Sequence, residues 1–325
     1  MTWLITGGAG YIGSHVVAET LKSGRDVVIL DDLSTGLETR MPESIPFARV
    51  TLTDAQSVLA VFKEHDIHGV LHLAARKQVG ESIERPDYYW EENVHGFQNL
   101  LDAMSASNVK KLVFSSSAAV YGQPELDRDA MITESTPCQP INPYGATKLV
   151  GEWYAQAKTV SDGMSVAALR YFNVAGAGRP EFGDVFAFNL VPIVFEAITN
   201  GRAPKIFGDD YPTADGTCIR DYIHVQDLAE AHVAAMDLVD SRDGIFEAIN
   251  IGTGRGSSVR EVIDMIADVS GIAITPEMIE RRIGDPAALV AQVAKARETL
   301  KWSSRYDLND IVTSAWQAWE FNANN

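Results

Sequence analysis

Hydrophobic positions along the first 175 residues alternate between short apolar runs and longer segments with apolar side chains every three to four positions. The short runs predict β-strands at residues 3–6, 27–30, 47–51, 69–73, 111–115 and 166–171. The longer segments predict helices at residues 12–22, 54–64, 87–106 and 144–158. This alternation of strands and helices is typical of an α/β fold with a doubly wound parallel sheet.

Beyond residue 176 the pattern becomes less regular. Helices are predicted at residues 189–200, 225–239, 258–270 and 307–321, and a short strand at residues 246–251. We therefore expect a doubly wound domain over residues 1–175 and a smaller mixed α/β domain over residues 176–325. We also expect the chain to cross back to the first domain around residues 215–250.

Gly7, Gly10 and Gly13 form the pattern G-x-x-G-x-x-G between the first predicted strand and the first predicted helix. Glycines at these places permit a tight turn and let a pyrophosphate approach the N-terminus of the helix. The next strand ends at Asp31, whose carboxylate can bind both hydroxyls of an adenosine ribose and would repel a 2′-phosphate. This context favours a Rossmann domain that binds NAD rather than NADP, and FAD fits the rest of the chain less well.

Tyr144 and Lys148 are four residues apart just after a predicted turn, so they share one face if that turn opens a helix. A lysine cation beside a phenol lowers the phenol pKa, which is normally near 10 and too high for base catalysis at neutral pH. Alone, such a pair has about a one-in-three chance of arising by accident in this chain. Ser117 adds a hydroxyl past the strand predicted at residues 111–115, where open sheets bind ligands, although three serines in a row can also form a simple polar turn.

Composition and charge exclude several classes of protein. The formal net charge of −17 opposes general binding to nucleic acids and to anionic membranes, although a few arginines can still hold a diphosphate. No apolar run approaches the ~20 residues of a membrane helix. Two cysteines, Cys138 and Cys218, are too few for a disulfide framework or a metal cluster, so we expect no bound metal. The N-terminus lacks the basic flank of a signal peptide, and we expect a cytoplasmic protein.

The glycine pattern, Asp31, the serines and Tyr-x-x-x-Lys together resemble the extended short-chain dehydrogenase/reductase superfamily. Within it, the chain resembles the UDP-glucose 4-epimerase family from residue 1 to nearly the C-terminus. Residues 74–82 (AARKQVGES), 170–177 (RYFNVAGA) and 206–225 (IFGDDYPTADGTCIRDYIHV) carry this narrower match. The segment YPTADGT is the most specific of these.

The resemblance implies an isomerase that interconverts UDP-galactose and UDP-glucose in galactose metabolism. Tyr144 would be the base, Lys148 its pKa partner and ribose anchor, and Ser117 a bridge to the sugar hydroxyl. The expected NAD-binding residues are Gly7, Gly10, Tyr11, Ile12, Gly13, Asp31, Asp32, Leu33, Ser34, Thr51, Leu52, Leu73, Ala74, Ala75, Lys77, Asn93, Ser115, Tyr144, Lys148 and Phe172. The expected UDP-sugar residues are Ser117, Tyr144, Asn173, Asn189, Leu190, Phe207, Arg220, Tyr222, Arg282 and Asp285.

Ala118 and Ala119 distinguish the chain from the sister sugar 4,6-dehydratases, which carry Asp-Glu there. Eliminating water needs an acid and a base, and two alanines supply neither. Two other readings stay open: an epimerase of UDP-N-acetylglucosamine or UDP-glucuronate, and a non-catalytic NAD-sensing regulator.

Four features depart from the family pattern: Thr51-Leu52, where an acid is usual; Glu92, where the family often has Asn; Leu289 at the gate position that varies with hexosamine use; and Gln292. The resemblance also implies a homodimer through residues 87–106 and 144–158, although Trp90 and Trp153 on these segments could equally be buried core.

Overall fold

The computed structural model describes residues 1–124, 131–282 and 285–324. Its largest element is a parallel seven-stranded sheet in the order β10-β6-β5-β4-β1-β2-β3. These strands are β1 Thr2–Thr6, β2 Asp26–Asp31, β3 Phe47–Arg49, β4 Ile67–His72, β5 Lys111–Ser117, β6 Ser165–Tyr171 and β10 Phe246–Ile251. The strand order reverses at β1, because β2 and β3 follow on one side of it and β4, β5 and β6 follow on the other. Open α/β sheets bind ligands at such a reversal. The predicted doubly wound parallel sheet is confirmed.

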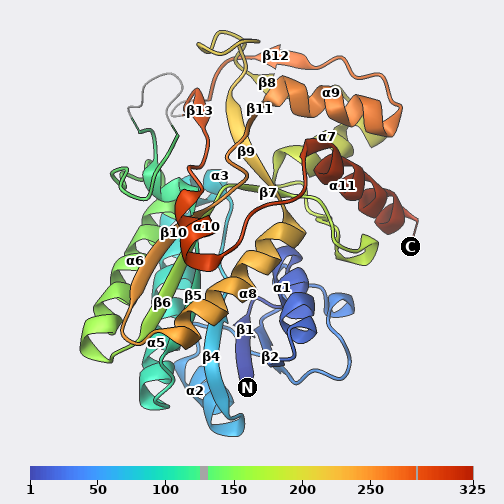
Figure 1. Cartoon of the computed structure of the whole chain (residues 1–325). Coiled ribbons are helices and arrows are strands. Elements are labelled where there is room, and N and C mark those ends of the chain that lie inside the picture. The colour runs from blue at the N-terminus through green and yellow to red at the C-terminus, as the bar shows by residue number, and fades with distance from the viewer. Residues whose placement is uncertain (125–130, 283–284, 325) are drawn as a thin grey trace.

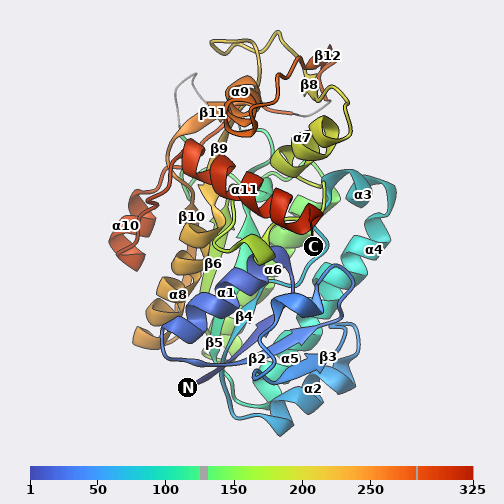
Figure 2. The ribbon, with the colours of Figure 1, turned by 90° about the vertical axis from the view of Figure 1, so that its right-hand side faces the viewer.

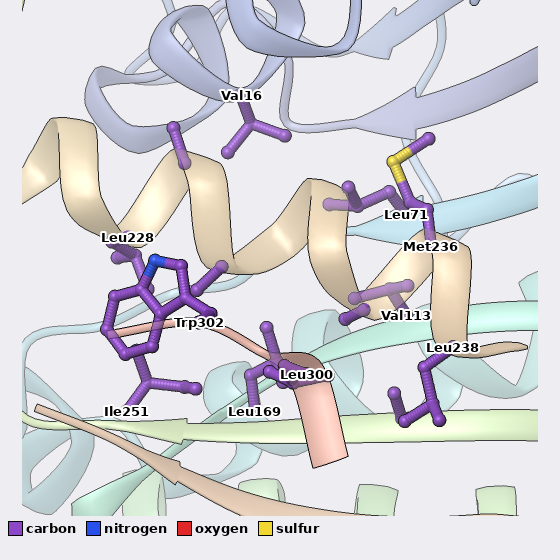
Figure 3. Close-up of a cluster of buried hydrophobic side chains, with 14 of the residues drawn as sticks. Val16, Leu71, Val113, Leu169, Leu228, Met236, Leu238, Ile251, Leu300 and Trp302 are labelled. Atoms are coloured by element: carbon purple, nitrogen blue, oxygen red, sulfur yellow. The ribbon is translucent and has the colours of Figure 1, made fainter. Parts of the chain in front are cut away.

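Helices cover both faces of this sheet (Figure 1). On one face lie α1 (Tyr11–Lys22), α8 (Val225–Ser241) and α10 (Ala294–Leu300), and on the other lie α2 (Ala55–Glu64), α5 (Gly96–Ala106) and α6 (Pro143–Ser161). Strand β1 shows why, because Trp3 and Ile5 join the first core whereas Leu4 joins the second. Figure 3 shows Val16 of α1 and Leu228 and Met236 of α8 over the sheet residues of the first core.

A smaller layer lies beyond the carboxyl ends of the strands (Figures 1 and 2). Its strands are β7 Asn173–Ala175, β8 Lys205–Phe207, β9 Ile219–His224, β11 Gly256–Ser258, β12 Glu277–Ile279 and β13 Ala288–Leu289. Strand β9 pairs with β7, β11 and β13, and β8 pairs with β12. Helices α7 (Leu190–Thr199), α9 (Val259–Ser270) and α11 (Leu308–Ala323) enclose a third core beside them.

Three predicted elements differ from the structure. The helix expected at residues 87–106 is divided into α4 (Pro86–Trp90), a π-helical turn (Glu91–His95) and α5. The strand expected at residues 111–115 continues to Ser117, so the serines belong to β5 and do not follow it, because each pairs with β6. The strand expected at residues 47–51 ends at Arg49. Helix α3 (Val79–Glu84) and the short strands of the smaller layer were not individually predicted.

The strand expected at residues 246–251 is present and forms an edge of the main sheet. Helix α8 also returns to this sheet from beyond residue 175. The division of the chain at residue 175 into two domains stays a prediction. Among the described residues, no helix is both long enough and apolar enough to cross a membrane.

Candidate active site

A cavity of about 560 Å³ opens at the carboxyl edge of the main sheet, beside the reversal in strand order. Its walls come from the segments that follow β1, β2, β4 and β6, from the end of β5 and from the first turns of α6. Segments 184–189 and Leu289 of the smaller layer close the other side. The size suits a ligand as large as a cofactor or a drug-sized molecule.

The glycine loop forms one wall of this cavity. Gly7 has a φ of 73°, and a Cβ there would lie 2.7 Å from the Ala74 backbone nitrogen. A Cβ at Gly13 would lie 2.0 Å from the Gly7 carbonyl oxygen. The glycines therefore let the loop pack against the next strand and leave the N-terminus of α1 open to the cavity, where it favours an anion.

Asp31 lies at the end of β2, next to this loop. Its carboxylate accepts hydrogen bonds from the backbone N–H groups of Ala9 at 3.0 Å and Leu33 at 2.9 Å. Burial raises the pKa of Asp31, and these two bonds oppose that shift. The neighbouring Asp32 and Ser34 also line the cavity.

Tyr144, Lys148 and Ser117 meet at the other end of the cavity. Helix α6 begins after Asn142, whose side chain accepts the Gly145 N–H at 2.8 Å and so caps the helix. One turn later, Lys148 donates to the Ser115 carbonyl at 2.8 Å, and burial lowers the Lys148 pKa to about 7.

The pKa of the Tyr144 phenol was expected to fall beside Lys148, and the structure contradicts this expectation. Burial raises this pKa, and a hydrogen bond with the Ser117 side chain partly opposes the rise. Ser117 is itself held in place, because its hydroxyl accepts the Ala119 N–H at 3.1 Å. The phenol and the Ser117 hydroxyl are thus coupled, but the ammonium does not dominate the phenol pKa.

Most expected NAD-binding residues line the cavity, and three do not: Leu33, Asn93 and Ser115. Asn93 instead positions the loop after β4, because it accepts the Arg76 N–H at 2.7 Å and donates to the Arg76 carbonyl at 3.0 Å. Ser115 contributes its carbonyl to Lys148, and its hydroxyl lies 3.1 Å from His232.

Only some of the expected UDP-sugar residues line the cavity. Asn173 and Asn189 line the cavity, whereas Leu190, Phe207, Arg220, Tyr222, Arg282 and Asp285 do not. Strand register connects the two groups, because Tyr222 pairs with Asn173 and Arg220 pairs with Leu289.

The cationic residues of that second group are already in contact with neighbours. Arg220 forms an ion pair with Asp285, and the Arg282 guanidinium lies 3.7 Å from the centre of the Phe207 ring. Arg220 belongs to β9, and Arg282 follows β12.

Sequence reasoning missed several residues of the cavity wall: Arg76, Tyr88, Asp184, Phe186 and Phe188. Phe186 and Phe188 stack with ring centroids 5.5 Å apart, in a loop with no periodic pattern that could have indicated them. Arg76 had a signal, because it stands within the motif at residues 74–82. Glu92, noted only as a departure, also lines the cavity and pairs with Arg76 at 2.9 Å.

The arrangement combines a helix N-terminus that is open to the cavity, the Asp31 carboxylate, and a phenol with hydroxyl and amine partners. In the described part of the chain, no group of three or more His, Cys, Asp or Glu side chains is placed to hold a metal ion. The site therefore suits a dinucleotide at one end and proton transfer at the other.

Comparison with known proteins gives the same picture. Residues 3–252 match the sequence profile of the NAD dependent epimerase/dehydratase family. The chain is 44% identical over 320 residues to the UDP-glucose 4-epimerase of Corynebacterium glutamicum, covering 97% of this chain and 95% of the relative.

Two solved structures are similar over their whole length. A UDP-glucose 4-epimerase from Stenotrophomonas maltophila, with bound NAD and formylated UDP-arabinopyranose, has a TM-score of 0.93 and 36% identity, and the match covers 100% of this chain and 99% of that one. A UDP-glucose 4-epimerase from Brucella ovis in complex with NAD has a TM-score of 0.92 and 39% identity, with 98% of each chain covered.

Proposed function

The chain belongs to the NAD dependent epimerase/dehydratase family, and we propose that it interconverts UDP-glucose and UDP-galactose with tightly bound NAD. The observation that carries this proposal is the meeting of Tyr144, Lys148 and Ser117 in a cavity whose far end holds the glycine loop and Asp31.

The residues present fit NAD. Cβ atoms at Gly7 and Gly13 would collide with backbone, so only glycines permit this loop conformation. In this conformation the loop would let the pyrophosphate reach the N-terminus of α1. Asp31 would hold the adenosine ribose hydroxyls, and Lys148 the nicotinamide ribose. When bound, oxidised NAD would supply a hydride acceptor and a positive charge to the cavity that Tyr144 lines. That charge acts in the direction needed to bring the phenol pKa down towards neutral pH.

Tyr144 would take the proton from the 4-hydroxyl of the sugar and later return it. Ser117 would hold the same hydroxyl, because its own oxygen is fixed by the Ala119 N–H and hydrogen-bonds with the phenol. With bound NAD as the acceptor of the C4 hydride, loss of both hydrogens would give a 4-keto sugar. This sugar would turn over in the cavity and take the hydride back on the opposite face of C4. Arg220 and Arg282 would hold the diphosphate that stays bound during this rotation.

Ala118 and Ala119 limit the reaction to epimerisation. Both line the cavity next to Ser117, and neither carries an acid or a base for the removal of water. Oxidation at C4 followed by reduction is the productive course that remains.

Conversion of UDP-galactose into UDP-glucose without added cofactor tests the proposal. We expect turnover by the protein as purified, with NAD recovered from it after denaturation. Bound NAD without conversion of the sugar would contradict the proposed reaction and favour an NAD-sensing regulator.

Tyr144→Phe sharpens this test. The variant should lose roughly two to four orders of magnitude in rate, the usual contribution of a positioned base, and should still bind UDP. Near-normal turnover would mean that the base is another group.

Leu289 bears on the choice between related UDP-sugars, because it lines the cavity and its backbone pairs with Arg220. Its size lies between a bulky aromatic and a small gate residue. We therefore retain UDP-N-acetylglucosamine and UDP-glucuronate as candidate second substrates.

We further propose a homodimer through residues 87–106, which form α4, the π-helical turn and α5, and residues 144–158 of α6. Trp90 and Trp153 on these helices are 40% and 59% exposed, so they are not buried core, and Ile83 and Val160 add to the exposed apolar surface. Trp153→Glu should shift the sedimentation mass from about twice 35.4 kDa to the monomer value. Ile193→Glu, an exposed apolar position on α7, is the control and should leave the dimer intact.

We place the reaction in the cytoplasm. Both cysteines are free thiols, which suits a reducing compartment. Fractionation of cells that express the tagged protein would test this location.

A further inference from the structure

Arg76 brings a cation into the cavity, close to the acid at the end of β2. It lies after β4, and its side chain is 18% exposed. Its Nη1 donates to the Ser34 hydroxyl at 2.8 Å, and its Nη2 lies 3.4 Å from the Asp32 carboxylate. The guanidinium therefore stands beside the residues that directly follow Asp31.

This position matters for the cofactor, on the proposal that Asp31 holds the adenosine ribose. A 2′-phosphate on that ribose would approach the same segment, where the Arg76 guanidinium offers donors. The Ser34 hydroxyl already donates to the Asp32 carboxylate at 2.5 Å. A guanidinium fork is a good match for a phosphate group. In isolation, Arg76 would therefore favour NADP, against the effect of Asp31.

The Glu92 carboxylate binds the Arg76 guanidinium. One carboxylate oxygen of Glu92 accepts from Arg76 Nε at 3.1 Å and from Arg76 Nη2 at 2.9 Å. The Arg76 guanidinium also lies 5.1 Å from the centre of the Tyr88 ring, which limits its movement. By contrast, the two oxygens of Asp31 already accept backbone N–H groups. Glu92 is thus the acid that makes two hydrogen bonds with the guanidinium.

We propose that Glu92 is a specificity-determining residue for the cofactor. It would exclude NADP because its carboxylate already accepts the hydrogen bonds of the Arg76 guanidinium, and because it adds its negative charge to those of Asp31 and Asp32 nearby. The inference rests on the proposed use of NAD and goes beyond it, because it assigns cofactor choice to a pair of residues on the loop after β4 and the π-helical turn. The position of Glu92 in that turn also allows a purely structural role, which the experiment separates.

The test compares Glu92→Gln with Glu91→Gln. Glu91 is the adjacent acid on the same turn, but it pairs with His95 and is 55% exposed. Both variants remove one negative charge, and only Glu92→Gln releases Arg76. Each full-length protein is first freed of the nucleotide with which it was purified. It is then incubated with equimolar NAD and NADP and freed of unbound nucleotide. It is then denatured, and the released nucleotides are measured by chromatography.

We expect Glu92→Gln to raise the bound ratio of NADP to NAD by roughly three- to tenfold, and Glu91→Gln to leave it near the wild-type value. Glu92→Asn should shift the ratio in the same direction, which guards against a fault specific to one variant. The double variant Arg76→Gln/Glu92→Gln should lose the gain, because the phosphate then lacks its cation.

An unchanged ratio in both Glu92 variants, an equal rise in Glu91→Gln, or a gain that survives loss of Arg76 would overturn the proposal. Failure of the proposed function would look different, because the wild-type protein would then retain neither nucleotide or would retain NAD without converting the sugar.

Discussion

The buried ion pair between Glu152 and Arg170 supports α6, the helix that carries Tyr144 and Lys148, and its removal should be among the most destabilising single changes. Glu152 lies on α6, four residues after Lys148, and its side chain is 3% exposed. Arg170 lies on β6 and is 8% exposed, and it bonds to Glu152 through Nε at 2.8 Å and Nη2 at 2.5 Å. Replacing Glu152 by Gln keeps the shape and removes the charge.

The magnitude follows from what Arg170 retains after this change. Its Nη1 still donates to the Tyr121 hydroxyl at 3.0 Å, but no carboxylate balances the buried guanidinium. Breaking a buried pair by removing one partner typically costs about 3–5 kcal/mol of unfolding free energy. Glu152→Gln should lose an amount in this range, since the remaining partners of Arg170 are neutral.

Urea denaturation, followed by both tryptophan fluorescence and circular dichroism, measures the loss. A double-mutant cycle with Arg170→Met isolates the pair, because the double variant leaves no buried charge. Its destabilisation should fall short of the sum of the two single variants by about 2 kcal/mol or more. A loss under about 1 kcal/mol in Glu152→Gln, or additive single variants, would refute the reasoning.

Two further predictions concern the cavity. Unfolded lysine keeps its proton to about pH 10.5, whereas folded Lys148 releases it above about 7, so the unfolded state binds more protons between these values and stability rises with pH. In protein freed of nucleotide, Lys148→Met should raise the free energy of unfolding by up to about 4 kcal/mol at pH 7, and this gain should shrink as pH rises. A difference in melting temperature between variant and wild type that stays constant with pH would contradict this. Leu289→Ala should raise, and Leu289→Tyr lower, kcat/KM for UDP-N-acetylgalactosamine relative to UDP-galactose by about tenfold, and equal ratios in both variants would remove Leu289 as the gate.

The main sheet could be predicted because its strands are apolar runs buried on both faces. Strand β9 is equally central to the smaller layer, yet it reads Ile-Arg-Asp-Tyr-Ile-His and gives no such run. Its Asp221 is fully buried and accepts N–H groups from Thr253, Gly254 and Ala291. A strand whose buried carboxylate binds the backbone of loops distant in sequence cannot be identified from the hydrophobic pattern alone.

The candidate site shows the same limit. Tyr144 and Lys148 could be paired from sequence because a helix sets the distance between positions four residues apart. Their pKa values could not, because both shifts arise from burial, which the spacing of two residues on one helix does not determine. The Arg76–Glu92 pair was missed for a related reason, since it joins a loop to a π-helical turn where a regular helix was expected.

The three serines at the end of β5 explain how this edge of the sheet can be both rigid and reactive. Ser115 lies 3.1 Å from His232 of α8 on one face of the sheet, whereas Ser116 donates to Glu152 of α6 on the other at 2.5 Å. This division follows from the alternation of side chains along a strand. The first two hydroxyls therefore anchor β5 to helices on both faces, and the third, Ser117, is left for the cavity. The position that would contact substrate thus takes its rigidity from buried neighbours, which a serine in a free turn would lack.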